Sequence, residues 1–176
     1  MSTDAFYTPP DRDHYFMGIA VAVRERANCR GRRVGAIAVR DHRIISTGYN
    51  GTPYGMKNCL DGGCRRCAKP ELYQSGTGYD LCICVHAEQN ALLAAARFGI
   101  ALDGSTIYST LRPCFGCTKE MLQAKVARVC YLHDWTHPDL EIHEEYALIQ
   151  TGFPKGIHPV EVDDPRFDWA NGKSHH

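Results

Sequence analysis

The chain of 176 residues is 44% hydrophobic, and its twenty basic and twenty acidic side chains give a formal net charge of zero. This length predicts one domain with a core of its own, and the balanced charge gives no indication of a nucleic-acid or membrane partner. No apolar segment follows Met1 and no apolar run reaches spanning length, so we expect a cytoplasmic protein.

The first third of the chain predicts a helix followed by a β-hairpin. Apolar side chains recur at helical spacing over residues 11–28, after the helix-start signal Pro9-Pro10. Two β-branched runs, residues 33–39 and 43–49, are separated by Asp41-His42 and are typical of paired strands. The Gly, Asn and Pro residues that follow the second run indicate that the strand ends there.

Residues 57–84 form a long connection that contains five of the nine cysteines. A loop of this length needs an organising contact of its own. An odd number of cysteines in a cytoplasmic protein indicates metal ligands or free thiols before disulfides. Metal is therefore the contact that we expect to order this connection.

The second half of the chain alternates between helices and strands. Helices are predicted over residues 86–97, 114–124 and about 138–150, and strands over residues 105–110 and 127–132. Alternation of this kind predicts an α/β fold in which helices cover both faces of a sheet and the site lies at the strand ends.

The C-terminal region gives weaker signals. We expect residues 1–165 to form the single domain, with residues 158–162 as an edge strand, where Pro is tolerated. Residues 166–176 are expected to be a loosely ordered tail. We assign no function to His175-His176.

Two motifs carry the chemistry. His86-Ala-Glu88 starts one helix, and Pro113-Cys-Phe-Gly-Cys117 starts the next. In this combination one His and two Cys bind Zn²⁺, and the Glu stays free to move protons. Cys114 and Cys117 are one helical turn apart, so both thiols can reach one ion. Three protein ligands leave the fourth tetrahedral position open for water, which is typical of a catalytic site.

Each motif alone has a simpler interpretation. A lone Cys-x-x-Cys is as typical of structural zinc or of redox chemistry, and a lone His-Ala-Glu is usually an ordinary helix start. Their joint presence favours a catalytic zinc site, and a closed structural zinc site is the alternative.

Four stretches resemble one family, the deoxycytidylate (dCMP) deaminases, including the related competence-operon deaminases. They are Val34-Gly-Ala-Ile37, residues 44–53, residues 85–92 and residues 110–117. The resemblance covers about residues 12–152. The zinc motifs are shared by all zinc nucleoside and base deaminases and indicate chemistry only, whereas the block Gly48-Tyr-Asn-Gly-Thr-Pro53 is what favours dCMP.

The resemblance implies a three-layer α/β/α fold with a central mixed sheet, a homo-oligomer that is a dimer or a hexamer, and hydrolysis of dCMP to dUMP with release of ammonia. Zinc would be the only cofactor. Glu88 would take a proton from the zinc-bound water and deliver protons to N3 and to the leaving amine.

Substrate contacts are also implied by the resemblance. Asn50 matches a residue that contacts the deoxyribose, and the alternative is an Asn in the left-handed αL conformation of a turn. Trp135 occupies a region where the family often places a Tyr near the substrate.

The substrate phosphate needs a cation, and four arginines cluster between the first helix and the first strand, at positions 26, 30, 32 and 33. Arg33 is the first choice, and a solvated basic face is the alternative. Arg97 matches a position that the family ties to activation by dCTP and inhibition by dTTP. A favourable interaction with the helix C-terminal dipole is the other interpretation of Arg97.

A second, closed zinc site is expected because cysteines are concentrated in the long connection. The favoured ligands are Cys29, Cys59, Cys64 and Cys82, of which the first three resemble the family's structural-zinc ligands. The choices between Cys64 and Cys67, and between Cys82 and Cys84, stay open. Cys130, within a strand, is expected to be a buried apolar residue. We therefore predict two zinc ions per chain.

Two other functions are compatible with the motifs. A tRNA adenosine or free-base deaminase would use the same zinc chemistry, but a tRNA-binding protein is expected to carry a basic excess. A non-catalytic, zinc-held interaction module of a DNA-uptake operon belongs to a different class, and the intact Glu88 argues against it.

Overall fold

The computed structural model describes residues 7–73 and 76–172, so His175-His176 lies outside the described residues. The helices are α1 (Arg12–Arg24), α2 (Arg65–Ala68), α3 (Ala87–Arg97), α4 (Phe115–Gln123), α5 (Leu140–Gln150) and α6 (Phe167–Ala170), with the 3₁₀ turns η1 (Cys59–Asp61) and η2 (Pro70–Leu72). The strands are β1 (Gly35–Arg40), β2 (Arg43–Tyr49), β3 (Thr106–Leu111), β4 (Arg128–His133) and β5 (Ile157–Pro159).

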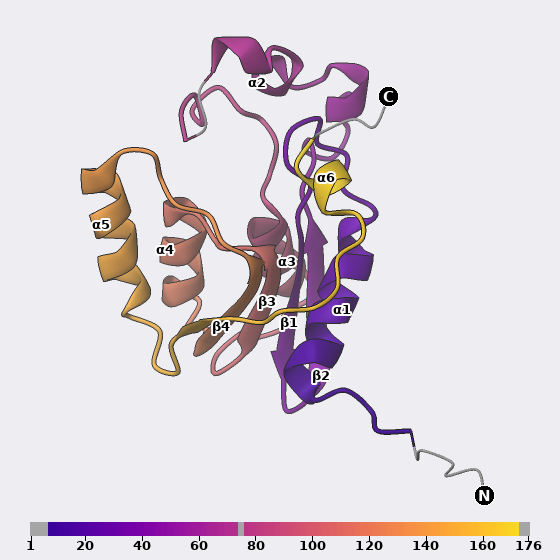
Figure 1. The fold of residues 1–176 in the computed structure, drawn as a ribbon, viewed down its shortest axis with the longest axis vertical. Coiled ribbons are helices and arrows are strands. Elements are labelled where there is room, and N and C mark those ends of the chain that lie inside the picture. The colour runs from indigo at the N-terminus through magenta and orange to yellow at the C-terminus, as the bar shows by residue number, and fades with distance from the viewer. Residues whose placement is uncertain (1–6, 74–75, 173–176) are drawn as a thin grey trace, which may run out of the picture.

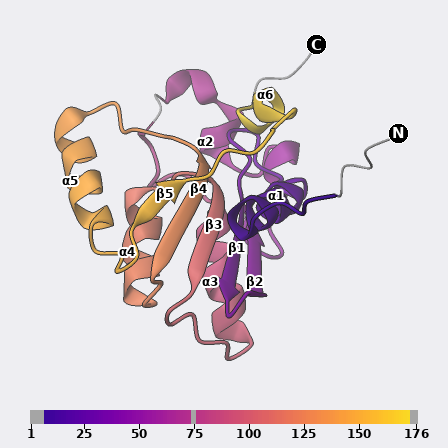
Figure 2. The ribbon, with the colours of Figure 1, turned by 60° about the horizontal axis from the view of Figure 1, so that its bottom comes forward.

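The five strands form one mixed sheet in the order β2-β1-β3-β4-β5 (Figure 2). β1 pairs antiparallel with β2 and β3, whereas β3, β4 and β5 are mutually parallel neighbours. The predicted hairpin is present, and its two turn residues, Asp41 and His42, both have positive φ. Two such residues are typical of a turn whose twist matches that of the flanking strands.

Helices cover both faces of the sheet (Figure 1). Phe16, Met17 and Ala20 of α1 pack on one face against a group of buried side chains that includes Ile37 and Tyr108. Ala38 follows Ile37 in β1, and Ile107 precedes Tyr108 in β3, so both side chains point to the opposite face of the sheet. There they pack with Ala95 of α3 and Met121 of α4. This alternation of buried side chains builds two cores, and the three-layer α/β/α fold is confirmed.

Two glycines allow helices to approach the sheet closely. A Cβ atom at Gly48 of β2 would lie 2.1 Å from the Ala87 carbonyl oxygen, at the start of α3. A Cβ atom at Gly35 of β1 would lie 2.4 Å from the Ala20 carbonyl oxygen of α1. Any larger side chain at Gly48 would therefore displace the first turn of α3, which carries the His-Ala-Glu motif.

The C-terminal segment is held more firmly than expected. Asp164 accepts hydrogen bonds from both terminal nitrogens of Arg24, at 2.6 and 2.8 Å, and its Oδ2 lies 2.7 Å from His133 Nε2. Residues 166–172 then pack on the domain, and the Ala170 carbonyl accepts a hydrogen bond from the Arg33 N–H at 2.7 Å. Residues 166–172 of the segment expected to be loosely ordered thus contact residues far away in the sequence, which no local pattern indicates, and residues 173–176 lie outside the described residues.

None of the helices in the described parts of the chain is long and apolar enough to cross a bilayer.

We predict that Asp164→Asn lowers the free energy of unfolding by about 3–5 kcal/mol, because it leaves the buried Arg24 guanidinium without its charged partner. Urea denaturation measures this loss. The exposed neighbour Asp163 provides the control, and Asp163→Asn should change the free energy of unfolding by less than about 0.5 kcal/mol. Equal effects of the two variants would contradict the role given to Asp164.

The same ion pair predicts a pH dependence. The hydrogen bonds from Arg24 lower the pKa of Asp164 to about 2. The pKa is thus lower in the folded state than the value of about 4 of an unfolded chain. This stabilisation is present above about pH 4 and is lost as the pH falls through about 2. Denaturation curves should show a smaller acid loss in Asp164→Asn than in the native protein.

Candidate active site

The three metal-binding side chains of the predicted site come together at the starts of two helices. His86 is the N-cap residue of α3, Cys114 is the N-cap residue of α4, and Cys117 lies in the first turn of α4. His86 Nδ1 is 3.4 Å from the sulfur of Cys114 and 3.4 Å from the sulfur of Cys117. One nitrogen and two sulfurs within 4.8 Å of one another suit a tetrahedral zinc ion with one position left open.

Backbone contacts fix the position of His86. Gly51 and Val85 exchange backbone hydrogen bonds of 3.2 and 2.8 Å, which join the end of β2 to the residue before His86. Gln89 Oε1 accepts a hydrogen bond from the His86 N–H at 3.0 Å, and Asn90 Nδ2 donates one to the Tyr49 carbonyl at 2.7 Å. The imidazole is therefore held by the sheet edge as well as by its own helix.

Glu88 is buried beside the three ligands. Its Oε1 accepts a hydrogen bond from Ser109 Oγ of β3 at 2.7 Å, and its Oε2 lies 3.6 Å from the Cys117 sulfur. Burial is the main cause that raises the pKa of Glu88 above its usual range. A carboxyl group with a raised pKa holds a proton more readily, which suits a group that must both accept and deliver protons.

The thiols and the imidazole influence one another's protonation. A hydrogen bond with Cys117, and a further one with His86, lower the pKa of Cys114 to about 4, although burial by itself raises it. The hydrogen bond with Cys114 raises the pKa of His86 to about 9. The pair thus favours a thiolate, which is the form that binds a metal ion.

A cleft of about 320 Å³ opens over this group. Its wall includes His86, Cys114 and Glu88, and also polar and aromatic residues from other segments. These further residues include Arg32, Asn50, Arg66, Tyr79, Arg112 and Trp135. The cleft is therefore bounded by a possible metal centre, a proton carrier and three cations.

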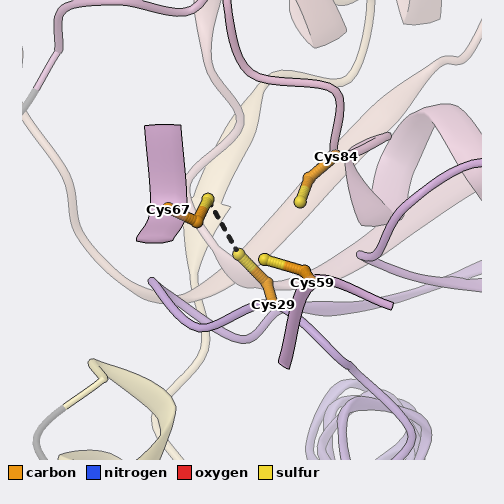
Figure 3. A group of neighbouring side chains, drawn as sticks. All are labelled: Cys29, Cys59, Cys67 and Cys84. Carbon is orange, nitrogen blue, oxygen red and sulfur yellow. Dashed lines mark hydrogen bonds between the residues drawn. The ribbon is translucent and has the colours of Figure 1, made fainter. Parts of the chain in front are cut away.

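Six cysteines gather next to the cleft in two overlapping groups of four. The first group is Cys29, Cys59, Cys67 and Cys84, whose side chains converge in Figure 3. The second group is Cys64, Cys67, Cys82 and Cys84. Within each group the sulfur atoms lie within 4.8 Å of one another, which allows them to hold a metal ion.

The comparisons with known proteins agree with this geometry. The family model described as the cytidine and deoxycytidylate deaminase zinc-binding region matches residues 10–133. The chain belongs to this family. A "Deoxycytidylate deaminase" of Schizosaccharomyces pombe is 43% identical over 122 residues, which are 69% of this chain and 37% of the relative. The chain thus spans little more than a third of that relative's length.

Two further relatives extend the comparison. "ComE operon protein 2" of Bacillus subtilis is 34% identical over 164 residues, which cover 90% of this chain and 76% of the relative. The crystal structure of a dCMP deaminase from the cyanophage S-TIM5, in complex with dCMP and dUMP, has a TM-score of 0.63 and 28% identity and covers 89% of this chain and 100% of that one. The fold is therefore that of a cytidine-deaminase-like protein.

The structure corrects the expectation for Arg33 in this family member. Arg33 is absent from the described residues that line the cleft, and its guanidinium donates a hydrogen bond to the Trp169 carbonyl and lies 4.7 Å from the centre of the Trp169 ring. Arg32 lines the cleft instead. The C-terminal segment draws Arg33 away, and an arginine run in the sequence gives no sign of that.

Asn50 lines the cleft but already has two backbone partners. Its Oδ1 accepts a hydrogen bond from the Val34 N–H at 2.8 Å, and its Nδ2 donates one to the Arg32 carbonyl at 2.8 Å. Asn50 is not among the described residues with positive φ, so the αL interpretation was wrong. Contact with a deoxyribose stays a prediction. Trp135 lines the same cleft, with its ring 5.8 Å from that of His137.

Arg97 lies in the last turn of α3, at the end opposite to His86. It is exposed, and its guanidinium is 5.8 Å from the centre of the Phe98 ring. Arg97 is not among the described residues that line the cleft. An effector site there stays a prediction.

The predicted ligand set of the second zinc needs a correction. Cys29 and Cys59 group with Cys67 and Cys84, and not with Cys64 and Cys82. Sequence spacing missed this because the set depends on how α2 and the residues before α3 fold back onto the loop after α1. Cys130 is buried on the α1 face of the sheet, as expected.

The structure also shows residues that the sequence did not single out. Ser109 orients Glu88, and Arg32, Arg66 and Tyr79 line the cleft. The sequence gives only a weak indication of the role of Ser109, which lies near the end of a predicted strand, where the site was expected. Residues 66 and 79 lie in the long connection, where no periodic pattern places a side chain.

We predict that Asn50→Ala lowers the free energy of unfolding by about 1–3 kcal/mol. The substitution removes the side-chain acceptor of the Val34 N–H and the side-chain donor to the Arg32 carbonyl. Asn58, an exposed Asn whose side chain does not cap η1, is the control. Asn58→Ala should cost less than about 0.5 kcal/mol in the same urea titration. A loss at Asn50 as small as at Asn58 would show that the Asn50 side chain is not a structural clamp.

Proposed function

We propose that this protein hydrolyses dCMP to dUMP and ammonia. The observation that carries the proposal is the group of His86, Cys114 and Cys117 beside the buried Glu88, at a cleft of nucleotide size. Relatives named deoxycytidylate deaminase at 41–43% identity support it, as does the likeness to a phage dCMP deaminase with dCMP and dUMP.

Each residue of the site has a role in this reaction. His86, Cys114 and Cys117 would hold zinc, which would act as a Lewis acid and lower the pKa of a water molecule. Glu88 accepts a proton from the water that attacks C4 of the cytosine and delivers it to N3. It then takes the second proton of the same water and delivers it to the departing amine, which leaves as ammonia. Ser109 holds the Glu88 carboxyl group in place through the hydrogen bond to Oε1.

Arg32 is the proposed partner of the substrate phosphate. Arg112 is engaged by Gln150 and Asp134, and the Arg66 Nε donates to the Thr77 carbonyl. Among the described residues, the Arg32 guanidinium has no ion-pair partner. An exposed cation that lines a cleft and has no ion-pair partner among the described residues can bind a phosphate without breaking an existing ion pair.

We further propose that the cysteine groups hold structural zinc.

The implied homo-oligomer, a dimer or a hexamer, is supported by an apolar groove along α3 that includes Leu92, Leu93 and Ile100. Leu93 is 56% exposed, so its side chain is accessible to a partner chain. Gel filtration of Leu93→Glu against the native protein tests the oligomer, and addition of dCTP or dTTP to the assay tests effector binding near Arg97.

A substrate panel decides between the candidate functions. Ammonia release is followed with dCMP, dCTP, deoxycytidine, cytidine and tRNA adenosine. Turnover of dCMP well above the others supports the proposal. Preference for tRNA adenosine or for a nucleoside would overturn it in favour of another deaminase, and no turnover of any compound would favour the interaction module.

We predict that Glu88→Gln lowers kcat by a factor of about 100 or more and keeps the active-site zinc. The amide has nearly the shape of the carboxylate but cannot carry the proton, while all three metal-binding side chains stay in place. Elemental analysis and the ammonia assay measure the two effects separately. Loss of zinc in step with activity, or activity at the native level, would refute the role given to Glu88.

We predict that Arg32→Ala lowers kcat/KM for dCMP by about 10- to 100-fold, the range expected for loss of a charged hydrogen bond. Turnover of deoxycytidine, which has no phosphate, should change little. The neighbour Arg33 is the matched control: Arg33→Ala removes the contact with Trp169 and should reduce thermal stability, with equal effects on both substrates. A selective loss of dCMP turnover in Arg33→Ala and not in Arg32→Ala would reverse the assignment.

A further inference from the structure

The cysteine groups beside the cleft form a cluster of one residue type. Five buried cysteines pack together, with the partly buried Cys82 against them, and among the described residues no other hydrophobic side chain belongs to this cluster. The six come from four segments: the loop after α1, η1, α2 with its N-cap, and the residues that precede α3. In sequence order they are Cys29, Cys59, Cys64, Cys67, Cys82 and Cys84.

The sulfur distances fit metal coordination and not disulfide bonds. Sulfur atoms of Cys29 and Cys67 are 3.7 Å apart, those of Cys64 and Cys82 3.8 Å, and those of Cys67 and Cys82 3.9 Å. A disulfide needs about 2.05 Å. With zinc–sulfur bonds of about 2.3 Å, the edge of a tetrahedron of four sulfurs is about 3.8 Å, which matches all three distances.

Two residues belong to both tetrahedra. Cys67 and Cys84 occur in each group of four, whereas Cys29 and Cys59 occur only in the first and Cys64 and Cys82 only in the second. A zinc ion bound by the first group alone would leave Cys64 and Cys82 without a metal ion. Cys64 is buried, and the Cys82 sulfur contacts the sulfur of Cys67, a ligand of that ion. One ion in the second group would likewise leave Cys29 and Cys59 unused.

Charge does not oppose a second ion. One zinc ion with four thiolates has a net charge of minus two, and a second ion that brings two more thiolates leaves that charge unchanged. The thiols release their six protons to solvent as the two ions bind. The Arg30 N–H also donates to the Cys59 sulfur at 3.3 Å, a contact that stabilises a thiolate ligand.

We propose that the six cysteines bind two zinc ions in a single cluster, in which the sulfurs of Cys67 and Cys84 bridge both ions. Cys29 and Cys59 complete the first ion, and Cys64 and Cys82 complete the second. This binuclear cluster goes beyond the proposed function and does not depend on it. Together with the active site, the native chain would hold three zinc ions.

Metal content is measured first in a double variant, His86→Ala with Cys114→Ser, which lacks two ligands of the active site. Elemental analysis of this full-length chain after zinc loading and removal of free metal should give two ions per chain. One ion or none would overturn the proposal. This count does not depend on whether the native protein deaminates dCMP. The metal content therefore tests the cluster, and the substrate panel separately tests the proposed function.

Ligand variants in the same background separate the two ions. Cys64→Ser removes a ligand of the second ion alone and should leave one ion, whereas Cys130→Ala, at the buried thiol on the other side of the sheet, should leave two. Two ions retained in Cys64→Ser would overturn the proposal.

The bridges are tested in the native chain, with no substitution to disturb folding. Zinc is exchanged for an NMR-active cadmium isotope. Two bridging sulfurs predict two cluster signals that are split by coupling between the metals, with β-protons of Cys67 and Cys84 each coupled to both ions. Cluster signals without such coupling would overturn the bridged arrangement.

Discussion

The rest of the structure depends on the meeting of two helix N-termini at one edge of the sheet. His86 and Cys114 are the N-cap residues of α3 and α4, so their side chains project from helix ends where unpaired N–H groups favour negative charge. The approach of α3 to β2 depends on the absence of a side chain at Gly48. Gly48 thus helps to fix the position of His86 relative to Cys114 and Cys117, the three side chains that could bind one metal ion.

The long connection is ordered by a different principle from that of the two cores. Fixing the backbone costs about 1–2 kcal/mol per residue, and apolar burial offsets this cost in the layers around the sheet. Residues 57–84 bury few large apolar side chains, and their buried centre is made of thiols. Binding of a metal by thiolates can supply about 10 kcal/mol or more in small zinc domains, which is enough to replace a missing core.

Local patterns predicted the fold and the ligands that lie close together in sequence. Apolar periodicity gave each principal helix and strand to within a few residues, and Cys114 and Cys117 were placed on one helical turn. What the patterns missed depends on segments that are far apart. Arg33 is withdrawn by Trp169, and Asp164 is tied to Arg24. The two groups of four cysteines depend on how the long connection folds, and sequence spacing does not predict that fold.

The link between the thiol cluster and the active site is only one residue long. Cys84 belongs to both thiol groups, and Val85 alone separates it from His86. Three consecutive residues span at most about 11 Å even when fully extended, and Val85 is also pinned to Gly51. A displacement of Cys84 is therefore transmitted directly to the backbone that positions the His86 imidazole. Removal of metal from the cluster by a chelator, or oxidation that joins its sulfurs, would therefore also disturb the position of His86.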